Sequence, residues 1–263
     1  MPNVTSYTVI FIFGSIVGSF LNVCIYRIPR RISILIPSSR CPSCDTPIKP
    51  FDNIPVLSYI LLAGRCRACK AKISFRYPLV EILNALFYVL ILWRFGFGWH
   101  TLIYFIFCSA LIVITFVDLD SQIIPDVITL PGIPMGIIFG GLLLVNPFMR
   151  DLPLGIESSL IGAFVGFGFY YLVAKAGFWI LKKEAMGGGD IKLMSMVGGF
   201  LGWKGVILTT FLGSLSGAII GLLLILLKGK EGGSRIPFGP YLAFGSLITL
   251  FFGQEILNWY LGR

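Results

Sequence analysis

Residues 99–117 read WHTLIYFIFCSALIVITFV, a stretch without any Asp, Glu, Lys or Arg. An α-helix needs about 20 such residues to cross a bilayer. Comparable runs recur along the chain, and they are continuous rather than alternating, which disfavours a membrane β-barrel. The sequence therefore predicts an all-α polytopic membrane protein of about eight transmembrane helices, at 6–26, 79–95, 99–117, 127–146, 156–181, 190–202, 205–227 and 237–260.

The overall composition points to the same class. Of the 263 residues, 56% are hydrophobic and only 13% are charged. Soluble domains carry roughly 25% charged residues, and a single soluble core could not bury so much apolar sequence. A soluble globular protein is thereby excluded.

The 21 lysines and arginines are distributed unevenly between the expected loops. Ten of them lie between residues 27 and 78, against two acids. If that segment is cytoplasmic, sixteen basic residues lie on or near the cytoplasmic side and four on the other, which is the bias that orients helical membrane proteins. Both termini are then expected outside, and the basic segment is expected to contact anionic membrane lipids rather than nucleic acid.

Three parts follow from this arrangement: a first transmembrane helix at 1–26, a cytoplasmic loop domain at 27–78, and a seven-helix membrane domain at 79–263. The first apolar run is expected to be a retained helix rather than a cleaved signal peptide, because its positive charges follow it and no A-x-A site is found. A loop of about fifty residues cannot readily fold unless a cross-link, such as a disulfide or a bound metal ion, holds it together.

Four cysteines in this loop can supply such a cross-link. Cys41-Pro-Ser-Cys44 and Cys66-Arg-Ala-Cys69 form two C-x-x-C pairs separated by 21 residues. The spacing is close to that of zinc ribbons, in which two tight turns each give two thiolates to one tetrahedral ion. Disulfides, a redox pair and an iron–sulfur site are the alternatives, but disulfides suit an oxidising compartment. Four protein ligands leave no open position, so the zinc is expected to be structural.

Two acidic motifs stand at the ends of expected spans, FVDLDSQIIPD at 116–126 and MGGGDIKL at 186–193. The charge pattern puts both on one side of the membrane, so Asp118 and Asp190 could meet across the helix bundle. Two adjacent carboxyl groups that share a proton can act as general acid and base in amide hydrolysis. Asp120, Asp126 and Asp190 could instead cap helices, and the glycines could simply form a flexible loop.

Other functions fit the residues less well. His100 is the only histidine and is expected to pack at the outer interface, which disfavours a Ser-His-Asp triad or a histidine-ligated catalytic zinc. Cys24 and Cys108 lie in apolar spans and are expected to be packing residues. A transporter with aspartates beside broken helices and a zinc-ribbon adaptor are the two open alternatives.

With these motifs identified, the chain resembles a known family, the bifunctional type IV prepilin peptidases. The likeness rests on GSFLNVCIYRIP at 18–29, the two C-x-x-C pairs, DNIPVLSY at 52–59 and ISFRYPLVE at 73–81. The aspartate motifs complete it, because Asp118 precedes Ile124-Pro125 and GGGD at 187–190 matches the G-x-G-D pattern of that family.

The resemblance implies a multi-pass enzyme of the bacterial cytoplasmic (inner) membrane. Such enzymes remove the leader of prepilins and pseudopilins of pilus and type II secretion systems, cutting after a glycine on the cytoplasmic side. They then N-methylate the new N-terminal residue with S-adenosylmethionine. The resemblance also implies that Asp118 and Asp190 are the catalytic aspartates, and that the four-cysteine loop marks the bifunctional branch.

The site of methyl transfer is less clear from the residues. A cationic sulfonium would be helped by a nearby acid, and Glu81, Asp45 and Asp52 are the acids near the loop. The loop is too short for a Rossmann-like methyltransferase fold, so any site for the methyl donor must be unconventional. The cofactor-binding residues and the oligomeric state are left open.

Overall fold

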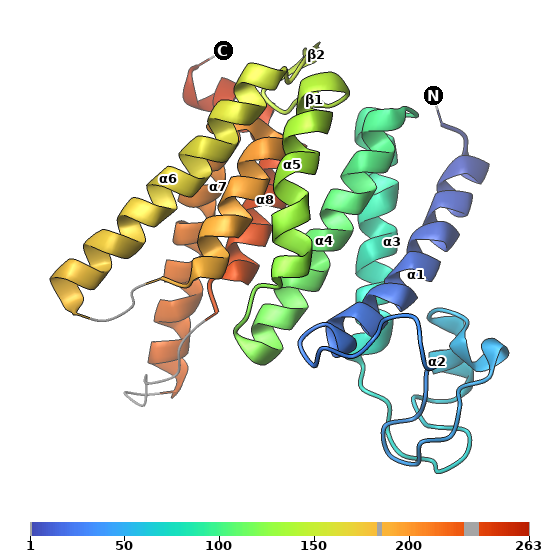
Figure 1. The fold of residues 1–263 in the computed structure, drawn as a ribbon. Helices are drawn as coiled ribbons and strands as arrows, with labels where there is room; N and C mark the ends of the chain where they lie inside the picture. Colours follow the sequence, from blue (N-terminus) through green and yellow to red (C-terminus); the bar gives the residue numbers. More distant parts are fainter. Residues whose placement is uncertain (1, 183–185, 229–236, 263) are drawn as a thin grey trace. The chain divides into compact units, whose positions relative to one another are not determined.

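The structure is a computed structural model that describes residues 2–182, 186–228 and 237–262 (Figure 1). The chain divides into two compact units, residues 1–113 and 114–263. Six of the described helices are long and apolar enough to cross a membrane, judged by length and composition. The predicted class, an all-α polytopic membrane protein, is confirmed. The three-part division at residues 26 and 78 stays a prediction.

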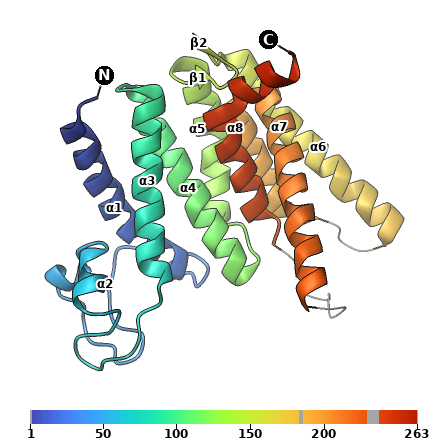
Figure 2. The same cartoon turned by 180° about the vertical axis from the view of Figure 1, so that it is seen from behind.

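The first unit consists of three long helices and a loop that carries two short ones. Its elements are α1 (Val4–Arg27), η1 (Pro50–Asn53), α2 (Leu57–Leu61), α3 (Arg76–Phe95) and α4 (Trp99–Ser121), whose end belongs to the second unit. α1 packs along α3 (Figure 2). The contact is close because an added Cβ at Gly14 or Gly18 would lie 2.7 Å from a Cα of α3. Small residues four apart allow this approach between apolar helices.

A buried polar network ties these three helices together. Asn84 on α3 donates to the carbonyl of Gly14 at 2.7 Å, and its own oxygen accepts from Ser109 of α4 at 2.9 Å. The ring of Tyr88 stacks on Phe105, with centroids 4.0 Å apart. In hydrocarbon such bonds satisfy groups that water cannot reach, so the network fixes the register of the helices.

The second unit is a bundle of glycine-rich helices. Its elements after α4 are α5 (Asp126–Leu142), β1 (Val145–Asn146), β2 (Met149–Pro153), α6 (Ile156–Leu181), α7 (Gly188–Lys228) and α8 (Gly239–Tyr260). α6 and α7 touch backbone to backbone where Gly162 faces Gly198 and Gly166 faces Met194. A larger residue at these positions would separate the two helices.

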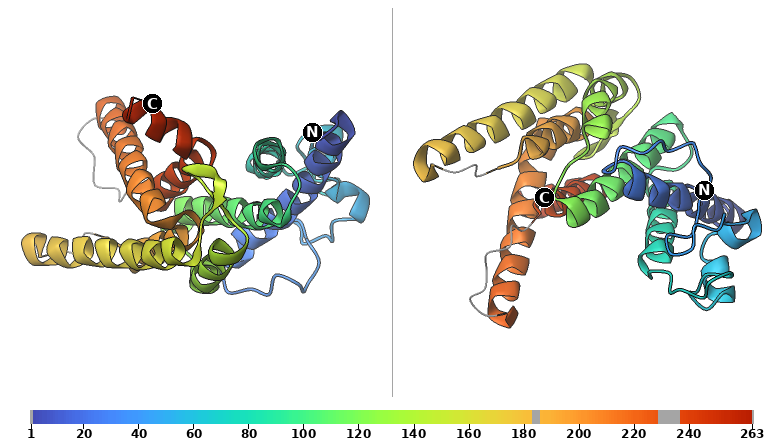
Figure 3. Two further views of the ribbon diagram at one scale, coloured as in Figure 1. Left: turned by 90° about the horizontal axis from the view of Figure 1, so that it is seen from above. Right: turned by 60° about the horizontal axis from the view of Figure 1, so that its bottom comes forward.

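The long helix α7 is two segments joined at Gly202, which has φ 73° and ψ 177°. The first segment begins near Ile124, since Gly189 lies against that side chain, and it ends at Gly202 beside Ser158 near the start of α6. The second segment returns along α8 until Gly217 lies against Tyr241, near the start of α8. The two segments therefore run in opposite directions. Figure 3 shows them as two separate helices.

This geometry bears on the expected spans 190–202 and 205–227. The chain reverses one residue before the expected gap, so the two spans exist as predicted. Glycine is required there because L side chains rarely adopt such a positive φ. Residues 183–185 and 229–236 of the expected loops at 182–189 and 228–236 lie outside the described residues, and with them the charges of Lys183, Lys230 and Arg235.

The predicted span 127–146 is wrong at its C-terminal end. α5 stops at Leu142, and an antiparallel hairpin of β1 and β2 follows. The chain turns at Asn146, whose side-chain oxygen accepts the N–H of Phe148 at 3.0 Å. Asn-Pro is a turn signal that an apolar count overlooks.

Candidate functional site

The carboxyl groups of Asp118 and Asp190 lie at one end of the second unit. Asp118 belongs to the last turn of α4 and Asp190 to the first turn of α7. Both are buried, with 5% and 8% of their surface exposed. They lie close enough to interact electrostatically. The structure thus brings together the two aspartates that the sequence singled out.

Asp118 is held by the start of α8. The backbone N–H of Gly239 donates to its Oδ2 at 2.9 Å. A Cβ on residue 239 would lie 2.6 Å from the same oxygen, so a larger residue would displace the carboxylate or the start of α8. The positive end of the helix dipole also points at the carboxylate. Gly239 is a site residue that sequence reasoning missed, although a glycine followed by proline is a typical helix start.

Asp190 is positioned by the packing of the residue before it. A Cβ on Gly189 would lie 2.7 Å from the Cβ of Ile124, and a Cβ on Gly239 would lie 3.3 Å from the end of the same side chain. Ile124 is itself buried. It therefore packs against both helix starts, and Gly189 serves close packing rather than only a flexible loop.

Of the two acids that could have capped a helix, Asp120 and Asp126, the structure assigns Asp126 a different role. Asp120 lies inside the last turn of α4 and not at a helix start. Asp126 is the first residue of α5, but the N-cap is Pro125, and no side chain caps this helix. The Asp126 carboxylate instead binds Lys192 Nζ at 2.7 and 2.8 Å. This exposed ion pair links the first turns of α5 and α7.

The four loop cysteines form a compact cluster in the first unit. The sulfur atoms of Cys41, Cys44, Cys66 and Cys69 all lie within 4.8 Å of one another. Those of Cys41 and Cys69 are 3.8 Å apart. Four thiolates at this separation repel one another, so the cluster suits a divalent metal ion that takes four sulfur ligands.

The two C-x-x-C turns share one backbone conformation. In each, the N–H of the residue after the second cysteine donates to the carbonyl of the first cysteine. That residue has a positive φ, 54° at Asp45 and 60° at Lys70. An antiparallel bridge closes each turn, Arg40 with Pro47 and Arg65 with Lys72. Two equivalent turns that aim their sulfur atoms at one point are the arrangement that the zinc-ribbon spacing predicts.

Hydrogen bonds within the turns prepare the thiols for a metal. The hydroxyl and N–H of Thr46 lower the pKa of Cys44 to about 6. The backbone N–H of Cys69 lowers the pKa of Cys66. Although the N–H of Ala71 also bonds to Cys69, the neighbouring sulfurs raise the pKa of that thiol to about 11. The turns thus favour thiolates at Cys44 and Cys66, and a bound cation would relieve the crowding of the sulfurs that raises the pKa of Cys69.

The remaining cysteines and the histidine have packing roles, as expected. Cys24 and Cys108 are buried, with 7% and 0% exposed. His100 Nε2 lies 3.0 Å from the carbonyl oxygen of Phe95, and its ring contacts the Phe95 ring edge-on.

Comparisons with known proteins cover nearly the whole chain. Residues 12–95 match the model of the bacterial peptidase A24 N-terminal domain, and residues 105–222 match that of the type IV leader peptidase family. The chain is 40% identical to a prepilin leader peptidase/N-methyltransferase of Aeromonas salmonicida, over 97% of the chain and 94% of that protein. The identity is 38% for the protein of that description from Pseudomonas aeruginosa (95% and 91% covered) and 34% for that from Neisseria gonorrhoeae (95% and 93%). No solved structure matches the chain.

Proposed function

We propose that this chain, which belongs to the prepilin leader peptidase/N-methyltransferase family, performs both reactions for which its relatives are named. It removes the leader of a type IV prepilin or pseudopilin and then methylates the new N-terminal amine. The observation that supports the first reaction best is the burial of Asp118 and Asp190 at one end of a membrane bundle, near enough to interact electrostatically.

Peptide hydrolysis follows from two carboxyl groups that hold one proton between them. The ionised carboxylate takes a proton from water, and the water oxygen attacks the carbonyl carbon of the scissile bond. The protonated partner gives its proton to the amide nitrogen as the C–N bond breaks. The two groups end with their protonation states exchanged. The Gly239 N–H keeps one oxygen of Asp118 in a constant position throughout.

The substrate would approach from the membrane. A mature pilin begins with an apolar helix, which can lie in the bilayer against the bundle. The scissile bond then reaches the membrane boundary, where the aspartate end of the second unit would lie. Loop charge supports a cytoplasmic location for this end and for the cysteine loop, in the bacterial inner membrane with the N-terminus outside.

The second reaction needs a methyl donor, and S-adenosylmethionine supplies an electrophilic methyl group when bound. The terminal amine of the cleaved pilin would lose its proton and form a bond to the methyl carbon while the bond between that carbon and the donor's sulfur breaks, which would turn the sulfonium into a neutral thioether. The four loop cysteines would hold a structural Zn²⁺ ion. With all four positions filled by protein, that ion would order the loop and take no part in hydrolysis.

The test uses Asp118→Asn and Asp190→Asn, which keep the side-chain shape and remove the charge. Asp126→Asn is the matched control, because it removes a nearby exposed carboxylate from the same motif. Purified variants in detergent receive a prepilin and S-adenosylmethionine, and mass spectrometry reads leader loss and methyl gain. Both dyad variants should lose at least about 100-fold in cleavage rate. Cleavage at the parental rate by both folded variants would show that the aspartates are structural.

A further inference from the structure

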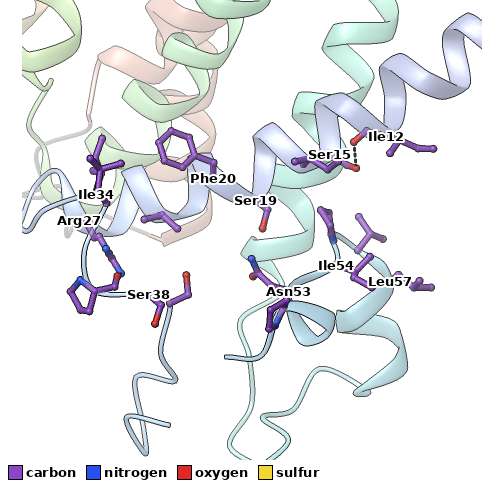
Figure 4. Close-up of a pocket in the computed structure, with 18 of the residues that line it drawn as sticks. Ile12, Ser15, Ser19, Phe20, Arg27, Ile34, Ser38, Asn53, Ile54 and Leu57 are labelled. Atoms are coloured by element: carbon purple, nitrogen blue, oxygen red, sulfur yellow. Dashed lines mark hydrogen bonds between the residues drawn. The ribbon is translucent and has the colours of Figure 1, made fainter. Parts of the chain in front are cut away.

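A cavity of about 810 Å³ lies in the first unit between α1 and the cysteine loop (Figure 4). Its walls are one face of α1 and the loop segments 34–39 and 50–57. Sites for small molecules usually measure about 300–1,000 Å³. All of its lining residues belong to the first unit, whereas Asp118 and Asp190 belong to the second.

The lining combines flat apolar surface with a few polar groups. Phe11 and Phe20 of α1 supply aromatic rings, Ser19 and Ser38 supply hydroxyls, and Asn53 supplies a carboxamide. Figure 4 shows Ser19 on α1 facing the part of the loop that holds Asn53. A nucleoside has the matching chemistry, since its base is flat and its ribose carries hydroxyls.

The structure distinguishes between the three acids near the loop. Asp45 pairs with Arg40 at 2.9 Å on the surface. Asp52 pairs with Arg67 at 2.6 Å, and this bond holds the pKa of Asp52 below its usual range. Both carboxylates already have a cationic partner. Glu81 of α3 is different, because it is buried, with 8% exposed.

Glu81 lies directly behind the cavity wall. Its Oε2 accepts the N–H of Val56 at 2.7 Å, and the Ser19 hydroxyl also bonds to the carboxylate. Both of these partners line the cavity. Val56 has a φ of 61°, an uncommon value for a β-branched residue. Strained backbone of this kind concentrates at binding sites, and here the buried carboxylate holds it in place.

A positive charge, that of Arg27, lies at one end of the cavity. The last turn of α1 forms this end. Arg27 is 9% exposed, and its guanidinium donates to the carbonyls of Ser33 at 2.9 Å and Pro37 at 2.7 Å. A guanidinium has five N–H donors, so others are left for a ligand. The cavity therefore has a buried cation at one end and a buried carboxylate behind its wall.

We propose that this cavity binds the methyl donor, an inference that rests on the proposed methylation. The donor is a nucleoside joined to an amino acid through a sulfonium. Its sulfonium cation matches the Glu81 side, its carboxylate matches Arg27, and its nucleoside matches the rings and hydroxyls of the lining. The cysteine cluster adjoins this site along the chain, because segment 34–39 leads into Cys41 and segment 50–57 lies between the two cysteine pairs.

The test measures binding directly, by equilibrium dialysis of radiolabelled S-adenosylmethionine against the full-length protein in detergent. Glu81→Gln removes the charge, and Leu57→Trp fills the cavity from α2. Leu61→Trp is the matched control, because Leu61 lies one turn later on α2, is 73% exposed and is outside the lining. We expect Glu81→Gln to weaken binding about tenfold or more and Leu57→Trp to abolish it, with Leu61→Trp at the parental value. Leader cleavage should be unchanged in all three.

The outcomes separate the cavity from the proposed function. If the parent methylates and both Glu81→Gln and Leu57→Trp bind the donor normally, the cavity assignment is wrong and the proposed function stands. Phospholipid that co-purifies with the parent but not with Leu57→Trp, together with unchanged donor binding, would identify a lipid site and also overturn the assignment. If the parent cleaves but neither binds the donor nor adds a methyl group, the proposed methylation itself fails.

Discussion

The cysteine loop of the first unit and the aspartate end of the second are held by different forces. In the loop, η1 has no buried residue and α2 buries only Ser58, so side-chain packing contributes little within these described segments. Two equivalent turns and four sulfur atoms define it instead. At the aspartate end, Gly189, Gly239 and Ile124 pack helix ends against one another.

The difference teaches that the two sites depend on different chemistry. A site organised by a metal fails when the metal leaves, whereas a site organised by packing fails when a Cβ intrudes. A substitution that disables one site should therefore leave the other site functional. Four predictions test how each site is held, and they are ordered by the size of the effect that we expect.

The largest effect is expected from removal of the metal. Cys41→Ser or Cys66→Ser takes away one ligand of the proposed metal site. In zinc-finger peptides a structural zinc ion contributes about 10–16 kcal/mol to folding. Metal content by mass spectrometry should fall to background, and methylation with it, while the leader is still cleaved. Cys24→Ser, outside the cluster, is the control. Equal loss of both reactions would contradict the independence of the two sites.

A methyl group at residue 239 should damage the aspartate end alone. Gly239→Ala places a Cβ 2.6 Å from Asp118 Oδ2, so the carboxylate or the start of α8 must shift. We expect cleavage to fall at least about tenfold, since small misplacement of catalytic groups is costly. Metal content should be unchanged. Gly168→Ala is the control because its Cβ meets nothing described within 4 Å, and a parental rate in Gly239→Ala would refute the positioning role.

Close packing between α6 and α7 should matter more for the thermal stability of the second unit than for the rate of cleavage. Gly162→Ala drives a Cβ into the backbone of Gly198, and such overpacking costs about 1–3 kcal/mol. The midpoint of thermal unfolding should fall, with cleavage per folded molecule largely retained. The comparison with Gly168→Ala on the same helix isolates the clash. An unchanged midpoint would mean that α6 and α7 are packed less closely than described.

The smallest effect is expected at the Lys192–Asp126 pair. Both groups are partly solvated, with side chains 33% and 55% exposed, so the pair contributes about 0–1 kcal/mol. Lys192→Gln should change the cleavage rate no more than about twofold. A loss comparable to that of Gly239→Ala would show that this pair also positions the aspartates.

The sequence by itself determined the features that are local in the chain. Apolar runs predicted the helices because burial in lipid depends on about twenty consecutive residues. The C-x-x-C spacing predicted the cluster because each turn contributes its two sulfur atoms from within four residues. Their motifs singled out Asp118 and Asp190, and the charge of the loops predicted that both lie on one side of the membrane.

Only the tertiary structure decided what depends on residues distant in the chain. The role of Gly239 arises from a contact with Asp118 across the bundle. The choice of Glu81 over Asp45 and Asp52 depends on which acids meet an arginine. Such contacts are set by the close approach of whole helices, and a linear pattern of hydrophobic residues says which segments enter the membrane but not which of them touch.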